Sequence, residues 1–210
     1  MIRKVVLVVQ GENEIGFLEG LRDRLRCDAE LVHYLQDHPE LRLRSQYTRR
    51  QDAKEIFRVH RSADLIVRLT DGDTDQPQNT YQEEVDRWPE ESRPLLVCGV
   101  CDRDIEHWIC IDTDYASRQL GFPADQLPAD RVDRSGFIKR RIDEVRGSQT
   151  RRQFLSGFVQ RAPSMTVRRW LGNRTFAHFY EQCRDKAQQA GCHVENLRES
   201  NERETECNAR

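Results

Sequence analysis

The chain has 210 residues, of which 37% are hydrophobic and 33% charged, and its formal net charge is −2. These values predict one domain, or one domain with a helical appendage, and exclude a wholly disordered chain. No apolar run reaches the length of a membrane span and the N-terminus lacks a signal-peptide pattern, so we expect no membrane partner. The seven scattered cysteines favour a reducing cytoplasm over a disulfide framework.

Apolar strands alternate with amphipathic helices in the first half of the chain. Residues 2–9 predict a strand, and Leu18, Leu21 and Leu25 form one apolar stripe of a helix over about 14–26. Strands separated by helices predict an α/β fold, with a mainly parallel sheet flanked by helices. The elements expected next are a short strand near 41–43, a helix over 52–61, a strand over 64–70, a polar helix or loop over 80–91, a strand over 94–101 and a helix over 104–112.

The pattern changes after Gly121. Pro123 and Pro128 mark a loop, and the remaining residues predict helices over 135–146, 151–159 and 172–190. We therefore expect three regions: an α/β core over 1–122, a helical C-terminal region over 123–194 packed on that core, and a disordered polar tail over 195–210.

Two of the predicted strands end in acidic segments. The first is followed by Gln10, Gly11, Glu12, Asn13 and Glu14, and the strand over 64–70 is followed by Asp71, Gly72, Asp73, Thr74 and Asp75. The carboxyl ends of parallel strands meet at one edge of a sheet, and hard divalent cations prefer oxygen ligands. The residues therefore predict a divalent-metal site at this edge, where Asp71, Asp73 and at least one of Glu12 and Glu14 converge.

The same segments resemble the motifs of a known family. Residues 9–14 are similar to the first TOPRIM motif, in which a strand ends in Glu-Gly and a second glutamate follows three residues after the glycine. Residues 65–73 resemble the second motif, a strand that ends in Asp-x-Asp. Residues 103–112 are similar to the Arg-Glu-Ile-Glu-Ala-Trp-Leu-Leu-Ala-Asp segment of small stand-alone TOPRIM-like proteins of bacteria, and residues 176–179 suit the C-terminal helix of that family. The resemblance covers about residues 4–180.

The resemblance implies a Mg²⁺- or Mn²⁺-dependent nucleic-acid enzyme, because TOPRIM domains occur in topoisomerases, primases, recombination proteins and nucleases of the OLD (overcoming lysogenization defect) type. It implies that Asp71, Asp73 and Glu14 hold the metal. The chain departs from the family at Gln10, where a glutamate is expected. Glutamine has no charge and cannot serve as a base, although Glu12 could replace it after a small shift in register. The catalytic candidates are therefore Gln10, Glu12 and Glu14, or else the site is impaired.

Three functions fit these residues. The first is a metal-dependent nuclease acting on DNA or RNA, as the effector of a bacterial anti-phage defence system with an AAA/ABC-type ATPase partner. That partner is implied by the family, whose members tend to be encoded beside such an ATPase. The second is a catalytically impaired TOPRIM-like subunit that binds and regulates the ATPase. The third is a metal-dependent phosphatase or another phosphotransfer enzyme on a similar sheet.

The expectation of a partner subunit also follows from what the sequence lacks, while its identity as an ATPase is what the resemblance implies. The phosphate-binding loop of P-loop NTPases and the dinucleotide fingerprint are both absent, so no nucleotide cofactor is predicted. Control of a nuclease would then come from another subunit. Apolar residues of the C-terminal region either form the docking surface for that subunit or cover one face of the sheet; they include Phe154, Leu155, Phe158, Trp170, Leu171, Phe176 and Phe179.

Other polar residues admit both structural and functional roles. Glu106 and Asp75 are candidates to support the metal ligands, and otherwise are structural acids. Cys98 and Cys101 have CxxC spacing, but they lie in an apolar strand, which favours thiols that pack as small hydrophobic groups. His107 is expected on a helix surface.

Arginine dominates the basic residues. Only four of the 34 are lysine, and arginine binds phosphate through two parallel hydrogen bonds. GC-rich codon usage accounts for this bias, and a basic groove that binds nucleic acid also fits it.

Overall fold

A computed structural model describes residues 2–25, 28–35, 49–72 and 77–191. Within these ranges the chain forms a four-stranded sheet of order β2-β1-β3-β4 in which all strands are parallel. The strands are β1 (Lys4–Val9), β2 (Glu30–Leu35), β3 (Leu65–Thr70) and β4 (Leu96–Val100). The predicted α/β fold with a mainly parallel sheet and a C-terminal helical region is confirmed.

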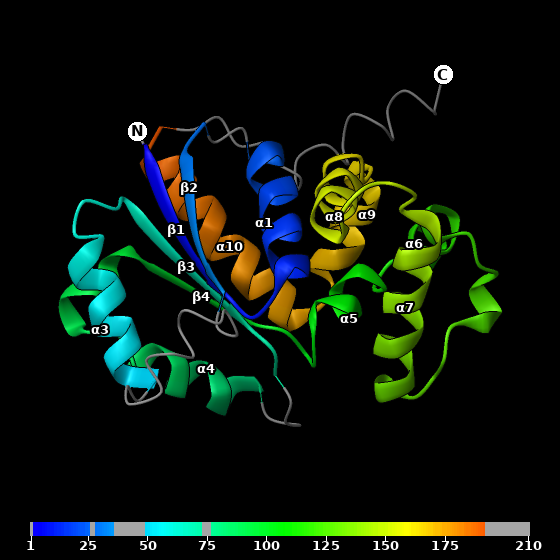
Figure 1. Ribbon diagram of the computed structural model, residues 1–210, viewed down its shortest axis with the longest axis horizontal. Helices are drawn as coiled ribbons and strands as arrows, with labels where there is room; N and C mark the ends of the chain where they lie inside the picture. The colour runs from blue at the N-terminus through cyan, green and yellow to red at the C-terminus, as the bar shows by residue number, and fades with distance from the viewer. Residues whose placement is uncertain (1, 26–27, 36–48, 73–76, 192–210) are drawn as a thin grey trace, which may run out of the picture.

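Helices cover both faces of this sheet (Figure 1). On one face lie α3 and α4, and on the other lie α1 and α10, while α5 to α9 extend the molecule beyond α1. The helices are α1 (Glu12–Arg24), α3 (Arg49–Val59), α4 (Pro77–Asp86), α5 (Ile105–Ile109), α6 (Thr113–Leu120), α7 (Arg131–Val145), α8 (Arg151–Gln160), α9 (Ser164–Leu171) and α10 (Arg174–Gln189), with short 3₁₀ turns η1 (Glu90–Leu95) and η2 (Ala124–Gln126). No helix in the described ranges combines the length and apolar character needed to cross a membrane.

The central strands are buried because each face of the sheet carries its own hydrophobic core. Alternate residues of β1 point to opposite faces, so Val6 packs in the core under α3 while Leu7 packs in the core under α1 and α10. A parallel strand covered on both faces reads as a continuous apolar run, as β1 and β4 do, and β3 departs from this only at buried Arg68 and Thr70. The register pairs Val8 with Arg68 and Thr70 with Val100, which brings the carboxyl ends of β1, β3 and β4 together.

The C-terminal helices belong to the larger of these cores. Their aromatic side chains are buried together with residues of β1 and α1, and the buried set includes Phe154, Phe158, Trp170, Phe176 and Phe179. These residues cover one face of the sheet, so an apolar docking surface made from them is wrong. In the described ranges, the exposed large hydrophobic residues are Val59, Val132, Val145 and Met165.

Two glycines of α1 allow α8 to approach it closely. A Cβ added at Gly16 would clash with the carbonyl oxygen of Arg152, and one added at Gly20 would clash with that of Ser156. The Arg152 guanidinium also pairs with Glu19, with 2.9 Å between Nε and Oε2. The C-terminal region therefore fixes the position of α1, which begins at the carboxyl edge of the sheet.

The element boundaries differ from the predictions in several places. α1 begins at Glu12, so the acidic segment forms its first turn. Strand β2 was not predicted, and neither were α6 and α9 as separate helices. The expected short strand near 41–43, the tail over 195–210, and Asp73 and Asp75 lie outside the described residues.

Candidate active site at the carboxyl edge of the sheet

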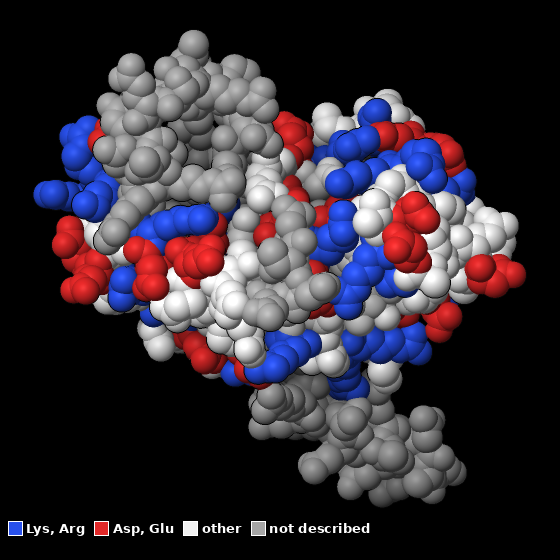
Figure 2. Space-filling view, turned by 90° about the horizontal axis from the view of Figure 1, so that it is seen from below, with Lys and Arg blue, Asp and Glu red and all other residues white. Residues whose placement is uncertain are grey.

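The candidate site lies where β1, β3 and β4 end. The Gln10 side chain donates a hydrogen bond from Nε2 to Thr70 Oγ1 over 3.2 Å, which joins the segments after β1 and β3. The Gly72 amide donates to the Arg103 carbonyl over 2.9 Å, which joins the segments after β3 and β4. These contacts hold three chain segments at one edge, seen from below in Figure 2.

Glycine at position 72 is required by this packing. A Cβ there would overlap the carbonyl oxygen of Cys101, so no other residue fits without a shift of backbone. The close approach places half-buried Asp71 beside the chain that leaves β4.

The pKa of the buried Cys101 thiol is affected by carboxylates from several chain segments. Burial raises the pKa of Cys101 well above its ordinary value, and the negative charges of four carboxylates raise it further. Those carboxylates belong to Asp71, Glu14, Asp104 and Glu106. The charges of acidic side chains from all three strand ends therefore act on one buried group. Cys98 and Cys101 themselves are buried free thiols, as expected for small hydrophobic groups.

Glu14 lies in the first turn of α1, and its side chain folds back toward Gly11. It is only 6% exposed, and Oε2 lies 3.1 Å from the position that a Cβ on Gly11 would take. Burial raises the pKa of Glu14, while hydrogen bonds from the backbone of Glu14 and Gly11 and the charge of Lys139 oppose the rise. Glu14 therefore caps α1 as well as facing the site.

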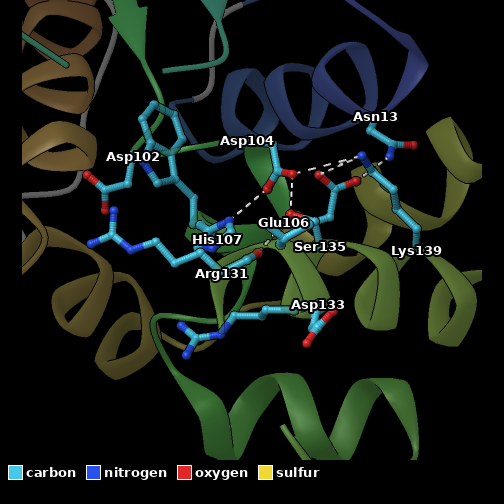
Figure 3. A network of polar contacts seen from close by, with 12 residues as sticks. Asn13, Asp102, Asp104, Glu106, His107, Arg131, Asp133, Ser135 and Lys139 are labelled. Atoms are coloured by element: carbon cyan, nitrogen blue, oxygen red, sulfur yellow. Dashed lines mark hydrogen bonds and ion pairs between the residues drawn. The ribbon is translucent and has the colours of Figure 1, made fainter. Parts of the chain in front are cut away.

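Asp104 is the centre of a polar network (Figure 3). It accepts hydrogen bonds from His107 Nδ1 over 2.8 Å and from the Ser135 hydroxyl, and Lys139 Nζ lies 3.9 Å from Oδ2. Burial alone would raise the pKa of Asp104, but these two hydrogen bonds and the charges of His107 and Lys139 hold it below its ordinary value. Asp104 therefore stays ionised.

Glu106 has the opposite protonation behaviour. Its side chain is 1% exposed, accepts a 2.7 Å hydrogen bond from Asn13 Nδ2, and lies 3.7 Å from Lys139 Nζ. Burial and the charges of Asp104 and Glu14 raise the pKa of Glu106 to about 8, although Lys139 opposes this. At neutral pH, Asp104 is therefore ionised while its neighbour Glu106 holds a proton.

The structure brings together some of the predicted site residues and separates others. Gln10, Glu14 and Asp71 lie at the shared edge, as expected for residues that follow β1 and β3. Glu12 is exposed at the start of α1, and its charge contributes to the raised pKa of Arg152. Asp73 and Asp75 are outside the described residues, so their predicted roles stay predictions.

The donor set suits a hard cation, although its present geometry is not that of a formed metal site. Among described residues, no three His, Cys, Asp or Glu side chains are placed to share one ion. The carboxylates are instead engaged: Glu14 with the start of α1, Asp104 with His107 and Ser135, and Glu106 with Asn13. Carboxylate oxygens are the ligands that Mg²⁺ and Mn²⁺ prefer, so the chemistry of these side chains fits either ion.

Several members of the network were missed by the sequence reasoning. Asp104, Ser135 and Lys139 were not singled out, and His107, expected at the surface, is only 7% exposed. Lys139 is one of four lysines in a chain whose other cations are arginine, and this rarity was the one available signal for it.

Cations border this edge on the side of the C-terminal helices. Figure 2 shows Lys and Arg side chains gathered on the right half of the face, the side on which α7 and α8 lie in Figure 1. Arg131 and Arg140 of α7 are exposed, and the positive charge of Arg151 on α8 interacts with Glu106. The edge therefore combines a buried acidic group with a basic border.

Comparison with protein-family models, with curated proteins and with solved structures finds no match for this chain.

Proposed function

We propose that the chain is a Mg²⁺- or Mn²⁺-dependent nuclease whose active site is the carboxyl edge of the sheet. The observation that carries this proposal is the position of acidic side chains directly after β1, β3 and β4, at one edge of the sheet, where Asp104 and Glu106 share Lys139. The similarity of residues 9–14 and 65–73 to TOPRIM motifs supports a phosphodiester of nucleic acid as the substrate.

Asp71, Glu14 and Glu106 are the residues that would hold the metal. A bound divalent ion supplies an electrophile for a phosphoryl oxygen and lowers the pKa of water. Glu106 holds a proton at neutral pH because its pKa is raised to about 8, and it would release that proton as a cation arrives.

The other residues of the network position these groups. Asp104, fixed by His107 and Ser135, keeps its negative charge near Glu106 and so favours the protonated form of that neighbour. Lys139 balances part of the negative charge when no other cation is near. Exposed arginines of the basic border would contact the phosphates of a nucleic-acid strand.

The direct test is cleavage of labelled single-stranded DNA, double-stranded DNA and single-stranded RNA with Mn²⁺, with Mg²⁺ and with EDTA. We expect metal-dependent cleavage of at least one substrate, reduced by about a hundredfold or more in Asp71→Asn, as is typical when an electrostatic group of an active site is removed. Asp125→Asn is the matched control, because Asp125 is exposed on η2.

The outcomes of this test separate the three function classes. Cleavage that persists unchanged in EDTA or in Asp71→Asn would contradict the proposal. Hydrolysis of a small phosphomonoester, with no cleavage of any nucleic acid, would indicate a phosphatase instead. No metal binding and no hydrolysis would favour the second candidate, an impaired TOPRIM-like subunit.

Two contacts favour that second candidate. Lys139 already lies between Asp104 and Glu106, in a place where a metal would otherwise balance their charge. Gln10, which replaces the expected glutamate, donates its amide to Thr70 and so belongs to a local hydrogen-bonded structure. In this form the protein would bind and regulate an ATPase without cutting nucleic acid.

In either form we propose an AAA/ABC-type ATPase as the partner, and anti-phage defence as the setting. The support is the family resemblance together with the absence of a phosphate-binding loop in the sequence. Since the aromatic residues of the C-terminal helices are buried, docking would use charged surface such as the basic border. Co-purification from the native host, with and without Arg131→Glu plus Arg140→Glu, tests this: loss of the ATPase in the variant supports it, and unchanged recovery contradicts this surface.

A further inference from the structure

A groove lies beside the candidate active site, on the side of the edge strand β4. It has a volume of about 750 Å³ and is lined by the first turn of α4, by Val100 at the end of β4 and by one face of α10. Binding sites for small molecules have volumes of this order, and this one begins a residue away from Cys101, the centre of the acidic group.

The groove has a defined direction, because α10 runs back along β4. At the start of α10, Thr175 donates a hydrogen bond to Asp102, which follows β4, over 3.0 Å. Two turns later Gln182 donates to the carbonyl of Cys98, within β4, over 3.1 Å. Arg174 therefore marks the end of the groove nearest the acidic edge, and Glu181 marks the far end.

The groove-lining residues of α10 form one stripe along the helix. Arg174, His178 and Glu181 stand at positions i, i+4 and i+7, which share a face. The rise of an α-helix places Arg174 and Glu181 roughly 10 Å apart along the axis. This distance is comparable with the length of a nucleoside monophosphate, from phosphate to the far edge of the base.

The side chains that line the groove change from basic to aromatic to acidic between Arg174 and Glu181. Arg174 is exposed and can bind a phosphate, and the first turns of α4 and α10 carry no acidic residue. Asp102, which follows β4 at this end, already accepts hydrogen bonds from Asn173 and Thr175. Midway, the rings of Tyr81 and His178 meet with centroids 5.1 Å apart and planes at 73°, which gives an aromatic surface. At the far end lies the half-buried carboxylate of Glu181, a hydrogen-bond acceptor.

We propose that this groove binds one nucleotide of a single-stranded nucleic acid, with its base packed on the Tyr81 and His178 rings and its phosphate on Arg174. Stacking on aromatic side chains is how proteins hold unpaired bases without strong sequence preference. The choice of a strand rather than a free nucleotide rests on the proposed function, since the phosphate end of the groove opens toward the acidic edge. The next phosphodiester of the strand would then reach that edge.

The test is a titration of the full chain in EDTA with 2-aminopurine deoxyriboside 5′-monophosphate, and with a single-stranded trinucleotide that carries the same base. Stacking quenches 2-aminopurine fluorescence. We expect saturable quenching by the protein, with tighter binding of the trinucleotide. Tyr81→Ala and Arg174→Glu should each weaken binding about tenfold or more, while Tyr81→Phe should keep it.

Two further variants and a spectroscopic check distinguish a loss of binding from a loss of folding. Ala177→Leu fills the groove from a half-buried position and should weaken binding without removing any core group. Arg118→Glu, on exposed α6, is the matched charge control and should bind as the unmodified chain does. Near-ultraviolet circular dichroism checks that each variant is folded.

The results separate this inference from the nuclease proposal, because no metal is present in the titration. Quenching that these variants weaken supports the groove even if the chain never cleaves a substrate. Absence of saturable quenching, or equal quenching in Tyr81→Ala, Arg174→Glu and Ala177→Leu, would overturn the inference even if cleavage is observed. Equal affinity for the mononucleotide and the trinucleotide would overturn the choice of a strand.

Discussion

Two charge clusters in the described part of the chain differ in how their buried carboxyl groups are paired. One lies on the α4 face of the sheet and joins Arg68, Glu84 and Arg87. The other is the network of Asp104, Glu106 and Lys139 at the carboxyl edge. The carboxyl groups of both are buried, whereas the Lys139 side chain is 42% exposed.

In the first cluster the protein supplies its own counter-charges at hydrogen-bond distance. Arg68 Nε lies 2.9 Å from Glu84 Oε2, with side chains 5% and 6% exposed, and Arg87 binds the other oxygen of the same carboxylate. Burial lowers the pKa of Arg68 to about 10, so it remains charged at neutral pH. Each oxygen of the buried Glu84 carboxylate is therefore paired with a guanidinium group, so this acid is fully matched.

In the second cluster carboxyl groups outnumber the cation near them. Lys139 Nζ stands 3.7 and 3.9 Å from Glu106 and Asp104, too far for strong hydrogen bonds, and Glu14 adds a third acid nearby. Burial and the charges of Asp104 and Glu14 together raise the pKa of Glu106 to about 8, so it holds a proton at neutral pH. A cluster left with surplus negative charge favours an added proton or cation, whereas a matched one favours neither.

The largest effect is expected in the matched cluster. Glu84→Gln removes the negative partner of buried Arg68, and loss of one partner of a buried pair typically costs about 3–5 kcal/mol of unfolding free energy. Urea unfolding measures this. Glu83→Gln, an exposed neighbour on α4, is the control and should change little. A cost of Glu84→Gln below about 1 kcal/mol would contradict the view that this cluster is structural.

At the unmatched cluster, Glu106→Gln should change how stability depends on pH. The pKa of Glu106 is raised from 4.5 to about 8 in the folded chain, so the folded state binds more protons than the unfolded state between these values. Unfolding free energy should therefore fall as pH rises from about 4.5 to 8.

In Glu106→Gln that fall should disappear. Above pH 8 the variant should be more stable than the unmodified chain by roughly 2–4 kcal/mol, and near pH 4.5 the two should be similar. Glu144→Gln, exposed on α7, serves as the control. Parallel pH profiles for all three proteins would show that Glu106 does not carry its proton in the folded state.

Lys139→Met should have a smaller effect on stability and an opposite effect on metal binding. Loss of the lysine charge should lower unfolding free energy by about 1 kcal/mol and strengthen Mn²⁺ binding by about tenfold, because a cation that competes for the carboxylates is removed. Calorimetric titration measures the affinity, with Lys54→Met on α3 as the control. Weaker Mn²⁺ binding in Lys139→Met would mean that the lysine assists the metal site instead.

The smallest change in stability is expected for Gln10→Glu. The new carboxylate would join Glu14 and Asp71 at the strand ends, so Mn²⁺ binding should tighten and metal-dependent cleavage should increase. Glu12→Ala should do little, because Glu12 is exposed and its charge acts on Arg152. If Glu12→Ala instead abolished cleavage, Glu12 would be the catalytic glutamate and Gln10 a structural residue.

The strands that the sequence predicted are those buried on both faces. β1, β3 and β4 are covered by helices on each side and are mostly apolar, although β3 carries the buried Arg68. Among the described residues, β2 lies at the edge of the sheet and pairs with β1. Because His33 in the middle of β2 is exposed, the strand has no continuous apolar run that would have predicted it. Short helices such as α6 and α9 were missed because their ends depend on capping, as when Asp112 accepts the Tyr115 amide.

Some residues of the candidate site could likewise be predicted from the sequence and others could not. Glu14 and Asp71 could be predicted because each follows a strand directly, so the sheet itself brings them together. Lys139 and Ser135 lie on α7, more than thirty residues after β4, and reach the site only through the packing of that helix. No local pattern encodes such a placement. Glu106 was found only through the resemblance of its segment.

The central claim is that the acidic edge binds a divalent cation in exchange for a proton, and calorimetric titration with Mn²⁺ at pH 7 tests it most directly. Runs in two buffers of different ionisation enthalpy give the protons released. We predict release of about one proton on binding, affinity that rises between pH 6 and 8, and loss of binding in Asp71→Asn but not in Asp125→Asn. No Mn²⁺ binding, or binding without proton release that Asp71→Asn leaves intact, would contradict the account.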